Sequence, residues 1–133
     1  MAEAFLQKHA GDVFEAESAG LEAGSLNPIV VEVMREIGID ISRNKIKEVF
    51  QFLKQGKSFH YVIMVCDEAS AERCPIFPGV VRRIHWNFPD PSKFSGTHES
   101  KLSQSRVVRD MIKAKVLEFI EQETTVRVHG TTV

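Results

Sequence analysis

The sequence YVIMVCD at residues 61–67 decides the fold class of this chain. Its first five residues are continuously apolar and rich in β-branched side chains, which is typical of a strand covered on both faces in a parallel sheet. Cys66 stands at the carboxyl end of this predicted strand. A further strand is predicted within residues 80–88, just before a Pro-Asp-Pro turn that closes it.

Segments with helical periodicity precede and follow these two strands in the sequence. An amphipathic helix is predicted from Met1 to about Ala10, and a second helix begins at Asn27-Pro28, where an N-cap residue precedes a proline at the first helical position. A short third helix and a long last helix, which opens near Thr97, are predicted from apolar residues one turn apart. These apolar positions are Ile46, Val49, Phe50 and Leu53 in the third helix and Val108, Ile112, Val116 and Phe119 in the last.

Residues 14–19 alternate apolar and polar side chains and are predicted as another strand. The order helix, strand, helix, helix, strand, strand, helix therefore predicts an α/β fold with a parallel sheet flanked by helices on both faces. In such folds, ligands bind beyond the carboxyl ends of the strands. Residues 124–133 alternate weakly, and they are either a frayed end or an extra strand.

Length and composition limit the possible function classes. A chain of 133 residues and 15.0 kDa corresponds to one domain, and 43% hydrophobic with 26% charged residues excludes wholesale disorder. Seventeen basic against eighteen acidic residues give a net charge of -1, which argues against a nucleic-acid partner. Without a run of roughly 18 apolar residues or a secretory signal pattern, we expect a cytoplasmic protein with no membrane partner.

The two cysteines, Cys66 and Cys74, are the first candidates for chemistry. In a reducing compartment such residues are more often free thiols, metal ligands or redox centres than a structural disulfide. Three interpretations are open: an inert buried Cys66 with an unrelated Cys74, a redox-active pair, or a zinc site. The zinc interpretation has the weakest support, because Cys-x7-Cys is not the usual close spacing of zinc ligands.

Asp90 lies between two prolines, on a stiffened loop just after a predicted strand, where active-site residues gather in α/β folds. It is a candidate general acid, and the alternative is a structural turn aspartate, since Asp and Pro are ordinary turn residues. Arg82, Arg83, Arg106 and Arg109 either attract an anion or are solvated surface residues. A glycine-rich phosphate loop and a Gly-x-Ser-x-Gly motif are both absent from the sequence.

Together, these residues make the chain resemble the thioredoxin-coupled arsenate reductases, which share the fold of the low-molecular-weight protein tyrosine phosphatases. The motifs that carry the resemblance are MAEAF at 1–5, SAG at 18–20, NP at 27–28, GIDIS at 38–42, VCD at 65–67, CPIFPG at 74–79, HW at 85–86, DP at 90–91 and RVVRDMI at 106–112. The resemblance implies one domain over residues 1–122, with residues 123–133 as a tail.

The resemblance also implies roles for the candidate residues. Cys66 matches the relay cysteine that attacks the sulfur of the catalytic nucleophile and releases arsenite, and Cys74 matches the one that closes a disulfide for thioredoxin to reduce. Asp90 matches the aspartate that protonates the leaving oxygen in the phosphatases and assists in the reductases. No cofactor is implied besides thioredoxin as external reductant.

No metal site is expected either. Glu3 and Ser18 match positions that help to bind potassium in some family members. A further acidic ligand of that site is replaced by Lys47 here.

One family feature has no counterpart in these 133 residues, namely the Cys-x5-Arg loop between the first strand and the first helix. In the family, its cysteine attacks the oxyanion, while its arginine and the N–H groups of the helix N-terminus hold the charge. The first strand is central in the family sheet, between the strands that correspond to residues 14–19 and 61–65.

We therefore expect an N-terminally truncated domain whose first central strand is missing or replaced, either by residues 124–133 or by a partner chain. Such a domain is expected to be inactive as given and to take arsenate or phosphate only if the loop is supplied. Its exposed sheet edges are expected to permit a homodimer.

Two other functions stay open besides arsenate reduction and the arsenic resistance that it implies. A tyrosine phosphatase of the same fold hydrolyses a phosphoester and needs no resolving thiols, so Cys66 and Cys74 argue against it. A non-catalytic thiol switch or binding remnant would use the same cysteine pair to report redox state or to dock thioredoxin.

Overall fold

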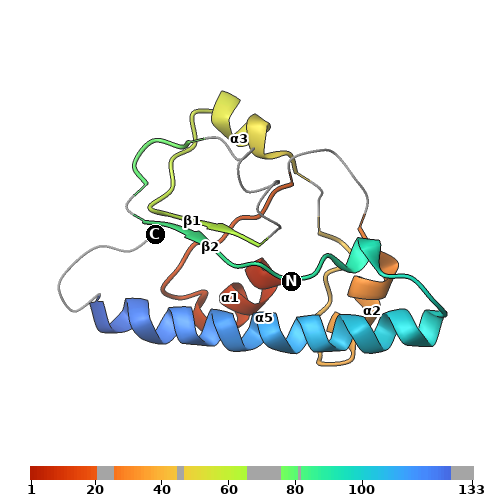
Figure 1. The fold of residues 1–133 in the computed structure, drawn as a ribbon. Coiled ribbons are helices and arrows are strands. Elements are labelled where there is room, and N and C mark those ends of the chain that lie inside the picture. Colours follow the sequence, from red (N-terminus) through yellow and green to blue (C-terminus); the bar gives the residue numbers. More distant parts are fainter. Residues whose placement is uncertain (21–25, 45–46, 66–75, 81, 127–133) are drawn as a thin grey trace.

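The computed structural model describes residues 1–20, 26–44, 47–65, 76–80 and 82–126. Its elements are α1 (Ala2–Ala10), α2 (Pro28–Arg35), α3 (Val49–Lys54), β1 (Tyr61–Met64), β2 (Arg82–His85), the short 3-10 helix η1 (Pro91–Lys93) and α5 (His98–Val126). Figure 1 shows α5 along one side of the molecule with α1 and α2 next to it, and α3 on the other side of the two strands. None of the helices described is long and apolar enough to cross a membrane.

The two strands confirm the predicted parallel sheet. β1 and β2 pair in parallel, with Tyr61 opposite Arg82 and Met64 opposite His85. All four residues of β1 are half-buried, between α3 on one side and α1 and α5 on the other. The fold is thus an α/β arrangement with helices on both faces of a small parallel sheet, as the sequence predicts.

The strand predicted at residues 14–19 is wrong. Within the described part of the chain these residues belong to no ladder, and the next residue, Gly20, makes an isolated parallel bridge to Glu48. A strand needs a hydrogen-bonded neighbour over several residues. The carbonyl of Ala16 instead accepts a hydrogen bond from the side-chain amide of Gln7, at 3.0 Å. Between this segment and β1 the described residues line a cavity of about 440 Å³.

The predicted helix starts are confirmed by their caps. The side chain of Asn27 accepts a hydrogen bond from the Ile29 N–H at 3.0 Å, and the hydroxyl of Thr97 accepts one from the Ser100 N–H at 3.1 Å. α5 continues to Val126, so residues 124–126 are helical. The extra strand predicted for the tail would therefore involve residues 127–133, which lie outside the described residues.

The apolar face predicted for the third helix is partly wrong. Phe50 and Leu53 are 42% and 39% exposed, whereas Phe52 is buried. Its ring packs against Phe59 with 5.8 Å between centroids, and Phe59 packs against Phe77 at 5.2 Å. α3 has only six residues. The contact of Phe52 with Phe59 therefore decides which side of this short helix faces inward.

The core is organised by the buried stripe of α5, as predicted. Val108, Ile112, Val116 and Phe119 are all buried along it. Phe119 contacts three other aromatic rings, with centroid distances of 5.6 Å to Phe14, 5.6 Å to Tyr61 and 6.1 Å to Trp86. The second half of α5 therefore holds the chain after α1, the start of β1 and the end of β2 in fixed relation.

Polar contacts join α2 to the first half of α5. The buried guanidinium of Arg109 donates to the carbonyl oxygen of Val33 at 2.9 Å and to Glu36 at 3.1 Å. Arg106 donates to both carboxylate oxygens of Glu36, and this hydrogen bonding lowers the pKa of Glu36. Two of the four arginines considered as anion-attracting residues, Arg106 and Arg109, thus contact α2 instead, which favours a structural role for them.

A buried carboxylate, which sequence analysis did not single out, fixes the other end of α5 to the sheet. Glu123 is 2% exposed, accepts a hydrogen bond from the Tyr61 hydroxyl at 2.7 Å and forms an ion pair with Arg82. Burial of the phenol raises the pKa of Tyr61, and the hydrogen bond to Glu123 and its negative charge raise it further.

Glu123→Gln should therefore lower the pKa of Tyr61, because the neighbouring negative charge is removed. Tyr61 is the only tyrosine, so an absorbance titration at alkaline pH reports on this residue alone. Because the folded-state pKa is raised, Tyr61 contributes stability below the ordinary phenol pKa of about 10, and this contribution is lost as the pH rises through the folded-state value.

The matched control is Glu118→Gln, an exposed carboxylate on the same helix, which should leave the Tyr61 titration unchanged. An identical titration curve for Glu123→Gln and the unsubstituted protein would contradict the assigned contact.

Candidate active site

The candidate site lies at the carboxyl edge of the sheet. Parallel strands end at the same edge, and here the ends are joined by a hydrogen bond from the Trp86 N–H to the Met64 carbonyl at 2.8 Å. The chain that leaves β1 leads to Cys66, and the chain that leaves β2 leads to Asp90. Two of the predicted site segments thus depart from neighbouring points, where ligands bind in folds of this class.

The beginning of α1 lies at the same edge. Ala2 and Glu3, in its first turn, line one cavity together with Met64 and Val65 at the end of β1. The first turn of α1 has no side-chain cap. Its N–H groups carry the partial positive charge of a helix N-terminus, which favours an anion. The amino group of Met1 has a lowered pKa because it is buried, although the charge of Glu3 opposes the shift.

Asp90 has the geometry of a turn residue. Its Oδ1 atom accepts hydrogen bonds from the Ser92 N–H at 2.9 Å and the Ser92 hydroxyl at 2.8 Å, which caps η1. The side chain is exposed. The structure thus supports the structural alternative for Asp90, and its action as a general acid stays a prediction.

Cys66 and Cys74 lie outside the described residues, so whether their sulfur atoms meet stays a prediction. The described residues on either side are exposed: Val65 is 43% exposed and Ile76 is 80% exposed. Phe77, which follows, is buried against Phe59. The two described residues that flank residues 66–75 are thus Val65, just after β1, and Ile76, next to Phe77 in the aromatic cluster of α3.

Among the residues that the structure describes, no three His, Cys, Asp or Glu side chains gather in a way that would hold a metal ion. Glu3 and Ser18, the positions linked by resemblance to potassium binding, are hydrogen-bonded directly to each other. Lys47 directs its ammonium group toward the Phe52 ring, 5.8 Å from the centroid.

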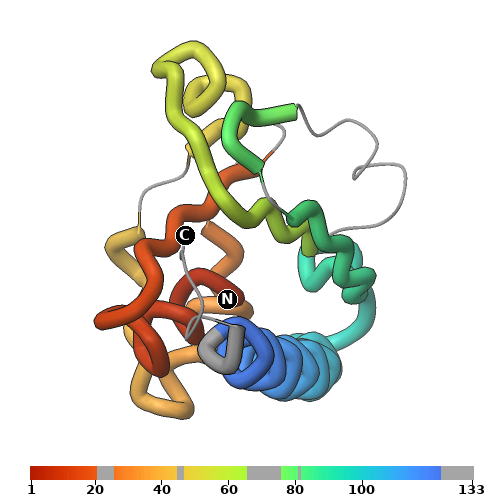
Figure 2. Tube along the Cα trace, turned by 90° about the vertical axis from the view of Figure 1, so that its left-hand side faces the viewer, coloured from red at the N-terminus to blue at the C-terminus, as the bar shows by residue number. Residues whose placement is uncertain are grey.

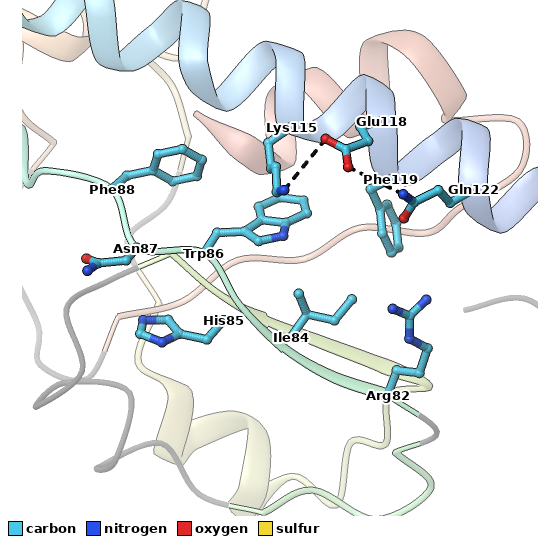
Figure 3. Close-up of a pocket in the computed structure, with 10 residues that line it drawn as sticks. All are labelled: Arg82, Ile84, His85, Trp86, Asn87, Phe88, Lys115, Glu118, Phe119 and Gln122. Carbon is cyan, nitrogen blue, oxygen red and sulfur yellow. Dashed lines mark hydrogen bonds and ion pairs between the residues drawn. The ribbon is translucent and has the colours of Figure 1, made fainter.

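A cavity of about 540 Å³ between β2 and the second half of α5 is shown in Figure 3. Within it, Lys115 lies 3.6 Å from Glu118, and the side-chain amide of Gln122 donates to Glu118 at 3.3 Å. Arg82 also lines the cavity, and its guanidinium forms an ion pair with Glu123, which does not line it. Because these charges are already paired with one another, we assign this cavity no part in the chemistry.

These observations define a class of protein: an α/β domain with a small parallel sheet, in which the loop of Asp90 and the N-terminus of α1 lie at the carboxyl edge of the strands. Residues 1–128 match the low molecular weight phosphotyrosine protein phosphatase family. The chain belongs to this family.

Several similar proteins in this family carry the name arsenate reductase. The arsenate reductase of Bacillus licheniformis is 41% identical over 121 residues, which is 91% of this chain and 85% of the relative. The arsenate reductase of Bacillus subtilis (strain 168) is 38% identical with the same coverage. A solved arsenate reductase in its reduced state is similar in structure, with a TM-score of 0.69 and 26% identity, over 91% of this chain and 86% of that chain.

Substitutions at Asp90 should separate its turn role from any chemical role. Asp90→Ala removes the acceptor for the Ser92 N–H and should destabilise the protein by about 1 kcal/mol, as for other lost caps. Asp90→Asn keeps the acceptor oxygen, so its stability should stay within about 0.5 kcal/mol of the unsubstituted protein. Urea unfolding measures both, and equal losses in the two variants would contradict the turn role.

Proposed function

We propose that this chain is the thiol-relay part of an arsenate reductase, with thioredoxin as its reductant. The observation that carries the proposal is the 41% identity to a relative named arsenate reductase over nine-tenths of the chain. The presence of two cysteines supports it further, since the relay needs two resolving thiols. Arsenate is a tetrahedral oxyanion like phosphate, which accounts for this activity within a family named for phosphatases.

The proposed cycle begins on a nucleophilic cysteine from a Cys-x5-Arg segment. Its thiolate displaces one oxygen of arsenate and forms a sulfur–arsenic bond. The Cys66 thiolate then attacks that sulfur, the sulfur–arsenic electron pair passes to arsenic, and As(V) leaves as As(III) in arsenite. Cys74 attacks Cys66 and releases the nucleophile, which leaves a Cys66–Cys74 disulfide.

Thioredoxin completes the cycle. Its dithiol reduces the Cys66–Cys74 disulfide and becomes a disulfide itself, so two electrons pass from thioredoxin to arsenic for each arsenite released. In this scheme Asp90 gives a proton to the oxygen that leaves arsenate. Both hydrogen bonds from Ser92 go to the Oδ1 atom of Asp90, so in this scheme its Oδ2 atom carries the proton.

The family description gives a second candidate, a phosphotyrosine phosphatase. Phosphoester hydrolysis would use the same Cys-x5-Arg segment and would leave Cys66 and Cys74 without a task. The relatives cited above carry the name arsenate reductase, so reduction is the better-supported activity.

The cysteine pair gives the first test. Mild oxidation of the chain should produce an intramolecular Cys66–Cys74 disulfide, seen by peptide mapping, and reduced thioredoxin should restore both thiols. Cys74→Ser is the matched control, because it leaves Cys66 with no intramolecular partner in a chain of two cysteines. Persistent free thiols, or a disulfide formed between chains instead, would contradict the relay and the thiol-switch alternative together.

Turnover gives the second test. The 133 residues contain no Cys-x5-Arg segment, so consumption of NADPH through thioredoxin reductase and thioredoxin should stay at background when arsenate is added. A fusion that places a strand and a Cys-x5-Arg segment ahead of Met1 should restore turnover. Replacing the new cysteine with serine, or introducing Cys66→Ser into the fusion, should return it to background.

Two results would count against the proposal. One is arsenate turnover by the unfused chain, and the other is a folded fusion that does not reduce arsenate. Hydrolysis of a phosphoester by the fusion at a rate unaffected by Cys66→Ser and Cys74→Ser would favour the phosphatase candidate.

A further inference from the structure

The cavity between β2 and the second half of α5, which we call the β2–α5 cavity, has an aromatic floor. Side chains two residues apart on an extended chain face the same side, so Ile84, Trp86 and Phe88 all line it, and Phe119 meets them from α5. Trp86 and Phe119 are buried, and the rings of Trp86 and Phe88 meet edge to face with 6.3 Å between centroids. Figure 2, which looks nearly along α5, shows the green segment that contains β2 on a different side of α5 from α1, and no residue of α1 lines this cavity.

The rim of the β2–α5 cavity carries a cation with unused donors. The Lys115 ammonium lies 3.6 Å from the Glu118 carboxylate, which is longer than a hydrogen bond. Among the residues that the structure describes, this ammonium donates no hydrogen bond to any other group. Figure 3 shows Lys115 extending from α5 toward Trp86. Its N–H groups therefore face a position over the aromatic floor, where an acceptor can reach them.

The charges along the rim favour an anion. Arg82 and Lys115 both line the cavity, and Glu118 is the one carboxylate in its described lining. Glu118 already accepts a hydrogen bond from Gln122 at 3.3 Å, and Glu123, the partner of Arg82, is buried outside the cavity. A cation bound over the floor would be repelled by both positive groups, whereas an anion would be attracted by them.

We propose that the β2–α5 cavity binds a small aromatic carboxylate, whose ring packs on Trp86 and Phe88 and whose carboxylate accepts a hydrogen bond from Lys115. Aromatic rings prefer edge-to-face or offset packing, and the floor offers both a face and an edge. The volume of about 540 Å³ lies within the range of roughly 300–1,000 Å³ that is usual for small-molecule sites. No step of the proposed arsenate cycle uses a residue of this cavity, so the inference stands apart from that proposal.

The test uses biphenyl-4-carboxylate, titrated into nitrogen-15-labelled protein and followed by nuclear magnetic resonance. Trp86 is the only tryptophan, so one indole N–H signal reports on the floor of the cavity. A saturable shift of this signal is expected. The matched control ligand is biphenyl-4-carboxamide, which has the same shape without the charge. It should bind about three- to tenfold more weakly, because a charge-assisted hydrogen bond is lost at a site where Lys115 is 43% exposed.

Substitutions of the two opposite charges on the rim test the location, because Lys115 and Glu118 line this cavity and not the one between residues 15–20 and β1. Lys115→Gln should weaken binding of the carboxylate by about three- to tenfold, and binding of the carboxamide by less. Glu118→Gln removes a negative charge beside the ligand and should strengthen binding of the carboxylate by about two- to fivefold. Lys113→Gln is the matched control, since Lys113 is on the same helix but outside the cavity lining, and it should change neither affinity by as much.

Several results would overturn the proposal. They are no saturable shift of the indole signal, equal affinity for the carboxylate and the carboxamide, or a folded Lys115→Gln variant that binds the carboxylate as tightly as the unsubstituted protein. The dispersion of the same spectra shows whether each variant is folded. Binding that occurs only after residues 127–133 are removed would also overturn it, by assigning the cavity to the chain's own C-terminal segment.

Discussion

The ring of Phe119 is the contact on which the rest of the structure depends. It touches Phe14, Tyr61 and Trp86, which lie after α1, at the start of β1 and just after β2. These residues are far apart in the sequence, so one side chain of α5 sets the relation between α1 and both strands. One turn further along α5, Glu123 adds a hydrogen bond to Tyr61 and an ion pair to Arg82. The second half of α5 therefore determines where the sheet lies.

The position of the sheet determines in turn where the candidate site can form. Both strands end at the same edge, and the first turn of α1 reaches that edge through the cavity it shares with Met64 and Val65. Asp90 is already held by Ser92 at the end of the loop after β2. The described part of the fold thus supplies a fixed frame for the candidate site, and Cys66 and Cys74 of the proposed relay lie outside the described residues.

Much of the fold could be predicted from the sequence because its determinants are local. The β-branched run at residues 61–65, the cap at Asn27 and the buried stripe of α5 each follow from neighbouring residues. The alternation of residues 14–19 predicts a strand that the structure lacks, because alternation is a local pattern, whereas a ladder needs a partner from elsewhere in the chain. For the same reason α3 buries Phe52 instead of Phe50, since Phe59 and Phe77 select the inward side.

The candidate site was predictable to a smaller extent. The two prolines that flank Asp90 predict a turn there, and in the structure Asp90 caps the 3-10 helix η1. Glu123 could not be found from the sequence, because a buried carboxylate is recognised only by its partners, here 62 and 41 residues away. Whether Cys66 and Cys74 meet depends on a path of the chain that no local pattern determines.

The contact between Arg109 and the Val33 carbonyl has a consequence for cooperativity. α2 has eight residues, fewer than the roughly 12–15 that an isolated helix needs to persist in water. Its C-terminal part is held by Arg109 and by the pairing of Glu36 with Arg106, both from the first half of α5. α2 therefore depends on this half of α5 for its persistence. Because Met34 of α2 belongs to the same buried cluster as Phe119, a loss of α2 would expose the core that also holds the strands.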